Sequence, residues 1–149
     1  MKYIEAPKNY ERQLDKISIF LAGGITGCPK WQDEVTMKLI DTNLVVINPR
    51  RKHFPINDPS AAEQQITWEY NHLRIADMIL FWFPKETLCP IVLYELGAWS
   101  TMDKPIFVGV HPQYQRRKDV EIQTKLIRPN VEVVYSLNEL VEQIKLELL

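Results

Sequence analysis

The sequence predicts an α/β protein, with one doubly wound parallel sheet of about five strands and helices on both faces. Two observations support this prediction. Short apolar runs of strand length alternate along the chain with longer segments of helical character. One of these runs, residues 78–83 (MILFWF), is apolar throughout, as expected for a central strand covered on both faces. Alternating strands and helices favour parallel strands joined by right-handed crossovers.

The first half of the chain supplies the first two expected strands. The run ISIFLA at 17–22 ends at Gly23-Gly24, a pair that permits a tight turn. The run LVVI at 44–47 is stopped by Pro49. The elements expected here are a polar lead-in over 1–15, a strand over 17–22, a helix over 31–40 and a strand over 44–47.

The second half continues the alternation, and two helix starts have capping signals. Asp58 precedes a proline at the first helical position, and Ser136 and Glu139 have the spacing of a capping box. The expected elements are a helix from 59 to about 76, a strand over 78–83, a helix over 90–102, strands over 105–110 and 131–135, and a helix from 136. Such a flavodoxin- or Rossmann-like sheet binds ligands at the carboxyl ends of its strands. That edge comprises the loop 23–30 and the segments after Phe83 and Val110.

Composition limits the classes of partner. The 149 residues fit one domain, residues 1–149, with 46% hydrophobic and 25% charged residues and a net charge of -1. This balance indicates neither a nucleic-acid nor a membrane surface and favours a small ligand. The one basic run, residues 116–118, is expected in a solvated loop.

The cysteine and histidine patterns predict neither a disulfide framework nor a metal site. Cys28 and Cys89 are far apart in the sequence, and the three histidines lack a metal-binding spacing. The first 16 residues contain no apolar stretch of signal-peptide length. We therefore expect a cytoplasmic protein with no metal.

Glu69 interrupts an apolar stripe on the helix from 59 to 76. A carboxylate there is either satisfied by local donors, with His72 and Arg74 nearby in sequence, or faces a cavity where its charge is used. The sequence leaves both interpretations open. The expected stripe consists of Ala62, Ile66, Leu73 and Ala76.

Glu95 lies in the second turn of the helix that follows the central strand, so it is expected near the ligand edge. Ile91 and Ala98 share its helix face. Gly97 costs about 1 kcal/mol relative to Ala inside a helix, and close approach of backbone or ligand would compensate. A purely structural Glu95 is an equally open interpretation at this point.

The glycine-rich loop after the first strand is a candidate ligand contact. Gly23-Gly24 and Thr26-Gly27 can let backbone N–H groups approach a sugar or phosphate, or can form a plain tight turn. The loop matches neither the P-loop nor the GxGxxG fingerprint. Most aromatic residues fall on core positions, although one of them could stack on a nucleobase.

Three segments together resemble the nucleoside 2-deoxyribosyltransferase family, whose relatives include deoxynucleotide N-hydrolases. They are ISIFLAGGITG at 17–27, WEYNHLRIAD at 68–77 and LYELGAW at 93–99. The resemblance implies that Glu95 is the nucleophile and that Glu69, eight residues before Asp77, contacts the base or sugar. It also implies a homo-oligomer in which Asn130 reaches a neighbouring site. The expected substrate contacts are Phe20, Gly23, Gly24, Ile25, Asp77, Cys89 and Asn130, with Asp77 mainly structural.

The chain departs from the family pattern at four positions. Phe20 stands where the transferases have a Tyr that touches the nucleophile, so the pKa of Glu95 must be set without that hydroxyl. Cys89 replaces the Asp of the transferases and the Ser of the hydrolases. Thr26 replaces an Arg of the hydrolases, which favours a free nucleoside over a 5′-phosphate. Glu69 replaces the more common Asp.

The resulting hypothesis is an enzyme that exchanges the base of a (deoxy)nucleoside through a covalent glycosyl intermediate on Glu95. In this mechanism protonated Glu69 hydrogen-bonds the departing base and delivers or relays a proton to it. The expected partners are a nucleoside and a free nucleobase, with no cofactor, because two carboxylates supply nucleophile and acid. Two alternatives stay open: an N-glycoside hydrolase acting on nucleosides or nucleotides, and a non-catalytic module that binds a nucleotide-like ligand.

Overall fold

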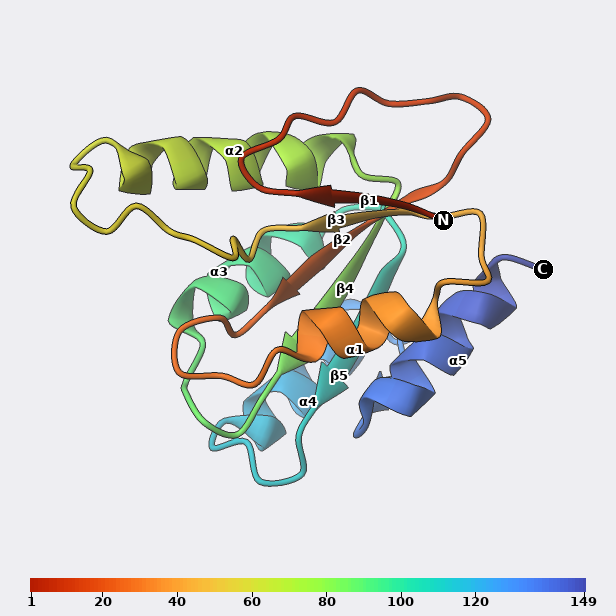
Figure 1. Ribbon diagram of the computed structural model, residues 1–149. Coiled ribbons are helices and arrows are strands. Elements are labelled where there is room, and N and C mark those ends of the chain that lie inside the picture. The colour runs from red at the N-terminus through yellow and green to blue at the C-terminus, as the bar shows by residue number, and fades with distance from the viewer.

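The computed structural model describes all residues 1–149 and forms one parallel sheet in the order β1-β3-β2-β4-β5-β6, with helices on both faces (Figure 1). This confirms the predicted α/β class, although the sheet has six strands instead of about five. The strands are β1 Lys2–Glu5, β2 Ser18–Gly23, β3 Val45–Asn48, β4 Met78–Phe83, β5 Ile106–Val110 and β6 Val133–Val134. The helices are α1 Trp31–Lys38, α2 Ala61–Ile75, α3 Pro90–Trp99, α4 Arg117–Ile127 and α5 Leu137–Glu147.

The sixth strand comes from the N-terminal segment, where we expected only a polar lead-in. β1 pairs in parallel with β3, with Lys2 opposite Val45, and forms an edge of the sheet. Of its four residues only Ile4 is fully buried. The strand is therefore held by hydrogen bonds to a distant segment, and its local sequence carries little apolar signal.

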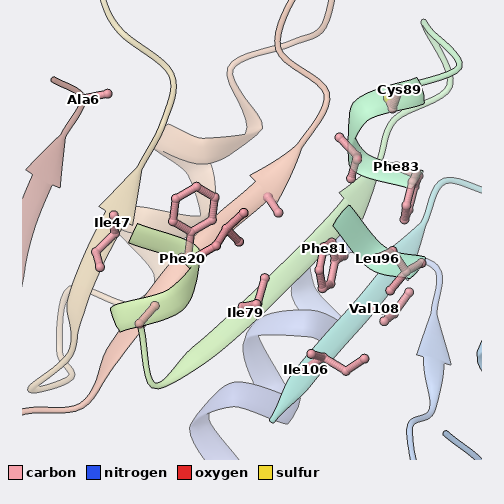
Figure 2. Close-up of a cluster of buried hydrophobic side chains, with 14 of the residues drawn as sticks. Ala6, Phe20, Ile47, Ile79, Phe81, Phe83, Cys89, Leu96, Ile106 and Val108 are labelled. Atoms are coloured by element: carbon pink, nitrogen blue, oxygen red, sulfur yellow. The ribbon is translucent and has the colours of Figure 1, made fainter. Parts of the chain in front are cut away.

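The central strands β2 and β4 bury side chains on both faces, as the apolar run of β4 predicts. On one face, Phe20, Ile79 and Phe81 pack with the inner sides of α2, α3 and α4. Figure 2 shows labelled side chains of this face spread over neighbouring strands, from Ile47 of β3 to Val108 of β5, with Cys89 and Leu96 on the side of α3. On the other face, α1 and α5 cover a second core that contains Trp31, Val35, Leu80, Leu140 and Ile144.

The basic run at 116–118 is not a solvated loop, as we expected, but the start of helix α4. Arg116 pairs with Asp119 at 3.0 Å and Arg117 pairs with Glu121 at 3.2 Å, both at helical spacing. Val120 and Thr124 are the buried positions of this helix. Charged neighbours can thus support a helix whose apolar side is too narrow to stand out in the sequence.

Several predicted boundaries shift by one to three residues, as helix ends commonly do. α2 begins at Ala61, because Asp58 accepts hydrogen bonds from the backbone and hydroxyl of Ser60 and forms a turn before the helix. α1 ends at Lys38 and α3 at Trp99, earlier than expected. The capping box is confirmed: Ser136 Oγ accepts from the backbone N–H of Glu139 and donates to its carboxylate. None of the helices is long and apolar enough to span a membrane.

The strand order places the reversal of the chain between β2 and β4. From β2 the chain crosses to β3 on one side and then returns to β4 on the other. The loops that leave the carboxyl ends of these two strands therefore diverge and leave a crevice at that edge, where open α/β sheets bind their ligands.

Candidate functional site

A cavity of about 400 Å³ lies at this edge, beside the carboxyl ends of β2 and β4. Seven of the nine candidate residues border it: Phe20, Gly23, Gly24, Ile25, Glu69, Cys89 and Glu95. The fold brings them from β2, the loop after it, α2 and the start of α3. The other residues around the cavity are Ala22, Thr26, Pro49, Thr87, Pro90, Ile91 and Val92.

Asp77 and Asn130 lie elsewhere. Asp77 precedes β4 and accepts hydrogen bonds at 2.8 Å from the backbone N–H and the hydroxyl of Ser18, and it pairs with Arg12. These bonds join the amino ends of β2 and β4, so Asp77 has a structural position and does not border the cavity. Asn130 borders a separate hollow with Pro105 and Ile106, before β5 and β6. Within one chain, Asn130 therefore lies near the amino ends of the strands, opposite the end that carries the cavity.

Glu95 borders the cavity from the second turn of α3, where its Oε2 atom is buried and accepts no hydrogen bond. Burial raises the pKa of Glu95 to about 8, and the negative charge of Glu69 adds to the rise. A buried carboxylate without a donor is costly to ionise. The residue that could have supplied a donor on β2 is Phe20, which is buried and packs on Trp68 with ring centroids 6.1 Å apart.

Glu69 differs from Glu95 because it has a polar support. Gln65, one turn earlier on α2, donates to Glu69 Oε1 at 2.8 Å and to the carbonyl of Pro49 at 2.8 Å. Arg51 donates to Gln65 Oε1 at 2.7 Å. Burial raises the pKa of Glu69, while the bond from Gln65 and the charge of Arg51 oppose that rise.

In the free site, these surroundings favour an order of protonation opposite to the one that the expected reaction requires. The mechanism expected from the sequence has Glu69 protonated and Glu95 ionised, but Glu69 has the supports that favour the ionised form and Glu95 has none. Two like charges in one cavity cannot both ionise easily, so the pair holds one proton over a range of pH. In the free site that proton rests mainly on Glu95.

Both interpretations of Glu69 hold in part, because it borders the cavity and has a local donor, but that donor is Gln65. His72 does not contact Glu69; its ring stacks on Trp68 at 3.8 Å, and its Nε2 accepts from the backbone of Tyr10. The expected stripe was also displaced, because Ala62 and Ile66 are exposed and the helix buries Ala61, Trp68, His72 and Leu73. The aromatic stack and its backbone bonds anchor the helix that carries Glu69.

The supports that the sequence reasoning missed are Gln65 and Arg51, together with Pro49 and Thr87 at the border of the cavity. Gln65 and Glu69 are four residues apart, a spacing at which helical side chains meet, so this pair was recognisable in the sequence. Arg51 reaches Gln65 from the loop after β3, and no local spacing signals that contact.

The two glycines at the end of β2 are required by close packing. A Cβ on Gly23 would run into the Trp31 ring and lie 2.6 Å from the Trp82 carbonyl. The Gly24 carbonyl accepts a 2.8 Å hydrogen bond from the Trp31 indole. The tight turn is confirmed, and contact of the loop with a ligand stays a prediction: Ile25 and Thr26 border the cavity, and their backbone N–H groups have no acceptor within the chain.

Gly97 does not have the role we expected. A Cβ there would meet nothing within 4 Å, so neither backbone nor side chain approaches it in this chain. It lies with Leu93 and Ser100 on the side of α3 that faces α4. Ala98, expected on the face of Glu95, is exposed and away from the cavity, whereas Ile91 borders it.

Cys89 holds the start of α3 in an unusual backbone conformation. It is the N-cap residue, with φ 49° and ψ 55°, in the left-handed region that non-glycine residues rarely adopt. Its thiol lies 3.2 Å from the Thr87 hydroxyl. Such strain persists only where the surroundings hold it, and it clusters at functional sites.

The sequence matches a model of one known protein family. The family model described as nucleoside 2-deoxyribosyltransferase like matches residues 16–114. The protein belongs to this family. The match includes β2 to β5, Glu69, Glu95 and the whole border of the cavity, whereas Asn130 lies outside it. A search of curated proteins found no match.

Membership of the family indicates an enzyme of nucleotide metabolism whose substrates are small nucleoside or nucleobase molecules. The cavity is large enough for such a ligand, since small-molecule sites measure roughly 300 to 1,000 Å³. Its border combines apolar side chains with two carboxylates.

The raised pKa of Glu95 predicts that this residue destabilises the folded protein at alkaline pH. Between the ordinary pKa of 4.5 and about 8, the folded protein keeps a proton that the unfolded chain releases, so stability falls as pH rises through this window. We expect Glu95→Gln to increase the free energy of unfolding at pH 8 by roughly 2 to 4 kcal/mol, at about 1.4 kcal/mol per pKa unit.

Urea denaturation at pH 5 and pH 8 measures this effect, and the gain should shrink toward pH 5. Glu142→Gln, which removes an exposed carboxylate of α5, is the matched control and should change stability little at either pH. Equal gains for Glu95→Gln at both pH values would contradict the assignment of a raised pKa.

Proposed function

We propose that this protein exchanges the base of a nucleoside or deoxynucleoside, with Glu95 as the nucleophile and Glu69 as the partner acid. The observation that carries the proposal is the meeting of two carboxylates from separate helices at one cavity, where a buried oxygen of Glu95 has no partner in the chain. A costly, unpaired carboxylate at a ligand edge is explained if its charge is used in the reaction.

In the first half of the reaction, ionised Glu95 attacks the anomeric carbon. The Glu95 O–C bond forms, the C–N bond breaks, and its electron pair leaves on the nucleobase nitrogen through an oxocarbenium-like transition state. Glu69 delivers the shared proton to the departing base. Substrate binding must therefore shift the proton from Glu95 to Glu69, which the developing positive charge on the sugar favours because it stabilises an ionised Glu95.

In the second half, another base attacks the glycosyl-enzyme and Glu69 accepts its proton, which restores the starting state. If water attacks instead, the products are free sugar and free base, and the protein is an N-glycoside hydrolase. The two activities use the same carboxylates and differ in whether the space left by the first base admits a second base before water.

Groups around the carboxylates suit the sugar and the base. The free N–H groups of Ile25 and Thr26 can donate to sugar oxygens, while Phe20 and Ile91 offer apolar surface. Gly23 and Gly24 permit the close packing of this loop beside the cavity. The reaction as written needs no metal or organic cofactor, since the protein supplies nucleophile and acid.

Base exchange is the direct test. Incubation of one deoxynucleoside with a different free base should produce the second nucleoside, and chromatography measures it. We expect Glu95→Ala to reduce the rate by at least about 10³-fold, because the covalent step is lost. Glu86→Ala, at an exposed carboxylate of the loop before α3, is the control and should retain activity.

Other outcomes of this experiment separate the alternatives. Free sugar and base without a new nucleoside would replace the transferase by a hydrolase. Ligand binding with no cleavage in a panel of nucleosides, nucleotides and dinucleotides would contradict catalysis and identify a binding module.

The shared proton predicts a bell-shaped pH profile of kcat/KM. The one-proton state is lost at low pH, when both carboxyls are protonated, and at high pH, when both ionise, so the upper limb should fall near the Glu95 pKa of about 8. Glu69→Gln removes the repelling charge and the acid. Its residual activity should be low and should rise with pH, with a midpoint below that of the wild-type upper limb. Wild-type activity that still increases above pH 9 would show that no shared proton is needed.

We also propose that the active form is a homo-oligomer in which Asn130 completes a neighbouring site. Exposed apolar side chains on the outer faces of α2 and α3 favour association: Ile66, Tyr70, Ile91 and Tyr94. Sedimentation should give an oligomer, and mixed Glu95→Ala and Asn130→Ala subunits should regain activity that neither variant has alone. A monomer at assay concentration would remove Asn130 from the site.

A further inference from the structure

The two cysteines of the chain, 61 residues apart in sequence, meet at the candidate site. A Cβ built on Gly24 would lie 2.7 Å from Cys28 Sγ and 2.9 Å from Cys89 Sγ. The two sulfurs can therefore be no farther apart than the sum of these distances. The Thr87 hydroxyl lies between them, 3.8 Å from Cys28 Sγ and 3.2 Å from Cys89 Sγ.

We propose that Cys28 and Cys89 form an oxidation site, at which a peroxide converts the two thiols into a reversible intramolecular disulfide. The inference depends on the placement of the two sulfurs and not on the proposed reaction. It concerns a covalent modification of the cavity border, which the family assignment does not describe.

The chemistry balances with hydrogen peroxide as the oxidant. One sulfur, as its thiolate, attacks a peroxide oxygen; the S–O bond forms, the O–O bond breaks, and the hydroxide released takes up a proton to become water. The second thiol then attacks the sulfenic sulfur, the S–S bond forms, and the S–O oxygen leaves as water with the thiol proton. Two thiols lose two electrons in total, and one peroxide is reduced to two waters.

The cavity gives the oxidant a route to an otherwise buried pair. Both thiols belong to buried residues, but Cys89 borders the cavity, so a molecule as small as peroxide can reach it there. Burial raises the pKa of Cys89, and the neighbouring Cys28 thiol and Glu86 add to the rise against the bond from Thr87. Oxidation is therefore expected to be slow at neutral pH and faster at pH 8.5, where more thiolate is present.

The absence of a side chain on Gly24 allows the sulfurs to approach. A disulfide requires an S–S bond of about 2.05 Å, so the two sulfurs must come closer together, through rotation of the side chains or a shift of the loop that carries Cys28. Cys28 lies in the turn after Gly24, where its backbone N–H donates to the Ile25 carbonyl at 3.2 Å. This turn is a short surface segment outside any helix or strand, and such segments adjust more easily than the sheet.

The disulfide would join the glycine loop to the N-cap of the helix that carries Glu95. Both segments border the cavity, so a covalent link between them changes its shape at the end where the sugar is proposed to bind. The expected loss of activity rests on the proposed function, whereas formation of the disulfide does not.

The test is treatment of the purified chain with hydrogen peroxide at pH 8.5, followed by intact mass measurement and peptide mapping. The expected product is a single chain, not covalently linked to another, that has lost two hydrogen atoms. Its peptide map should contain a Cys28–Cys89 linked peptide that dithiothreitol separates. Cys28→Ser is the matched control, because it keeps a polar atom in place but removes the second sulfur. It should gain oxygen on Cys89 or stay unchanged, and never lose two hydrogens.

Three results would overturn the proposal: oxygen addition to wild-type cysteines without a cross-link, a disulfide between two chains instead of within one, or unmodified thiols under conditions that oxidise the urea-unfolded chain. The activity measurement is made on the same samples. If base exchange falls at least tenfold on cross-linking and returns with dithiothreitol, the result supports the expected loss of activity in the disulfide form. A cross-linked protein with full activity would refute this loss of activity. A protein without any base exchange, oxidised or not, would refute the proposed function. The mass measurement decides in either case whether the disulfide forms.

Discussion

The site depends on the placement of Glu95, a carboxylate buried in a cavity beside a second carboxylate and given no hydrogen-bond donor by its own chain. Burial and the charge of Glu69 both oppose its ionisation. In the proposed reaction, this arrangement, which costs stability in the free protein, becomes favourable when positive charge develops on the sugar beside Glu95. The rest of the fold can be understood as the means of holding this unfavourable arrangement in place.

The scaffold holds the two carboxylates from different directions. Glu69 is fixed by Gln65, which also bonds to the carbonyl of Pro49 after β3, and by the stack of Trp68 and His72 within α2. Glu95 lies in the second turn of α3, a helix that begins at Cys89 in a left-handed conformation. The two helices begin after different strands, so the distance between the carboxylates is set by the sheet and not by a flexible loop.

The sequence was sufficient for the layers, the central strands and the edge at which the site lies, because long apolar runs such as 78–83 and the order of strands and helices carry that information. It failed for β1, whose pairing with β3 is long-range, and for α4, whose buried side is narrow. The sequence predicted that both carboxylates and the glycine loop lie near the ligand edge, and they border one cavity there. It did not give their order of protonation, which depends on Arg51 and on the lack of a donor near Glu95, and these are properties of the folded packing.

Phe20 and Cys89 affect the same carboxylate in related ways. Phe20 brings a ring without a hydroxyl to the cavity, so β2 offers Glu95 no donor, and Cys89 brings a weakly polar thiol whose pKa is itself raised by burial. Both substitutions make the cavity less polar than a border with Tyr and Asp would be. In the proposed reaction, a less polar border would keep the proton on Glu95 until substrate binds, and it would leave ionised Glu95 a stronger nucleophile, because nucleophilicity rises with basicity. Cys89 also places a sulfur beside Cys28, so the low polarity of this border and the proposed oxidation of the thiol pair follow from one residue.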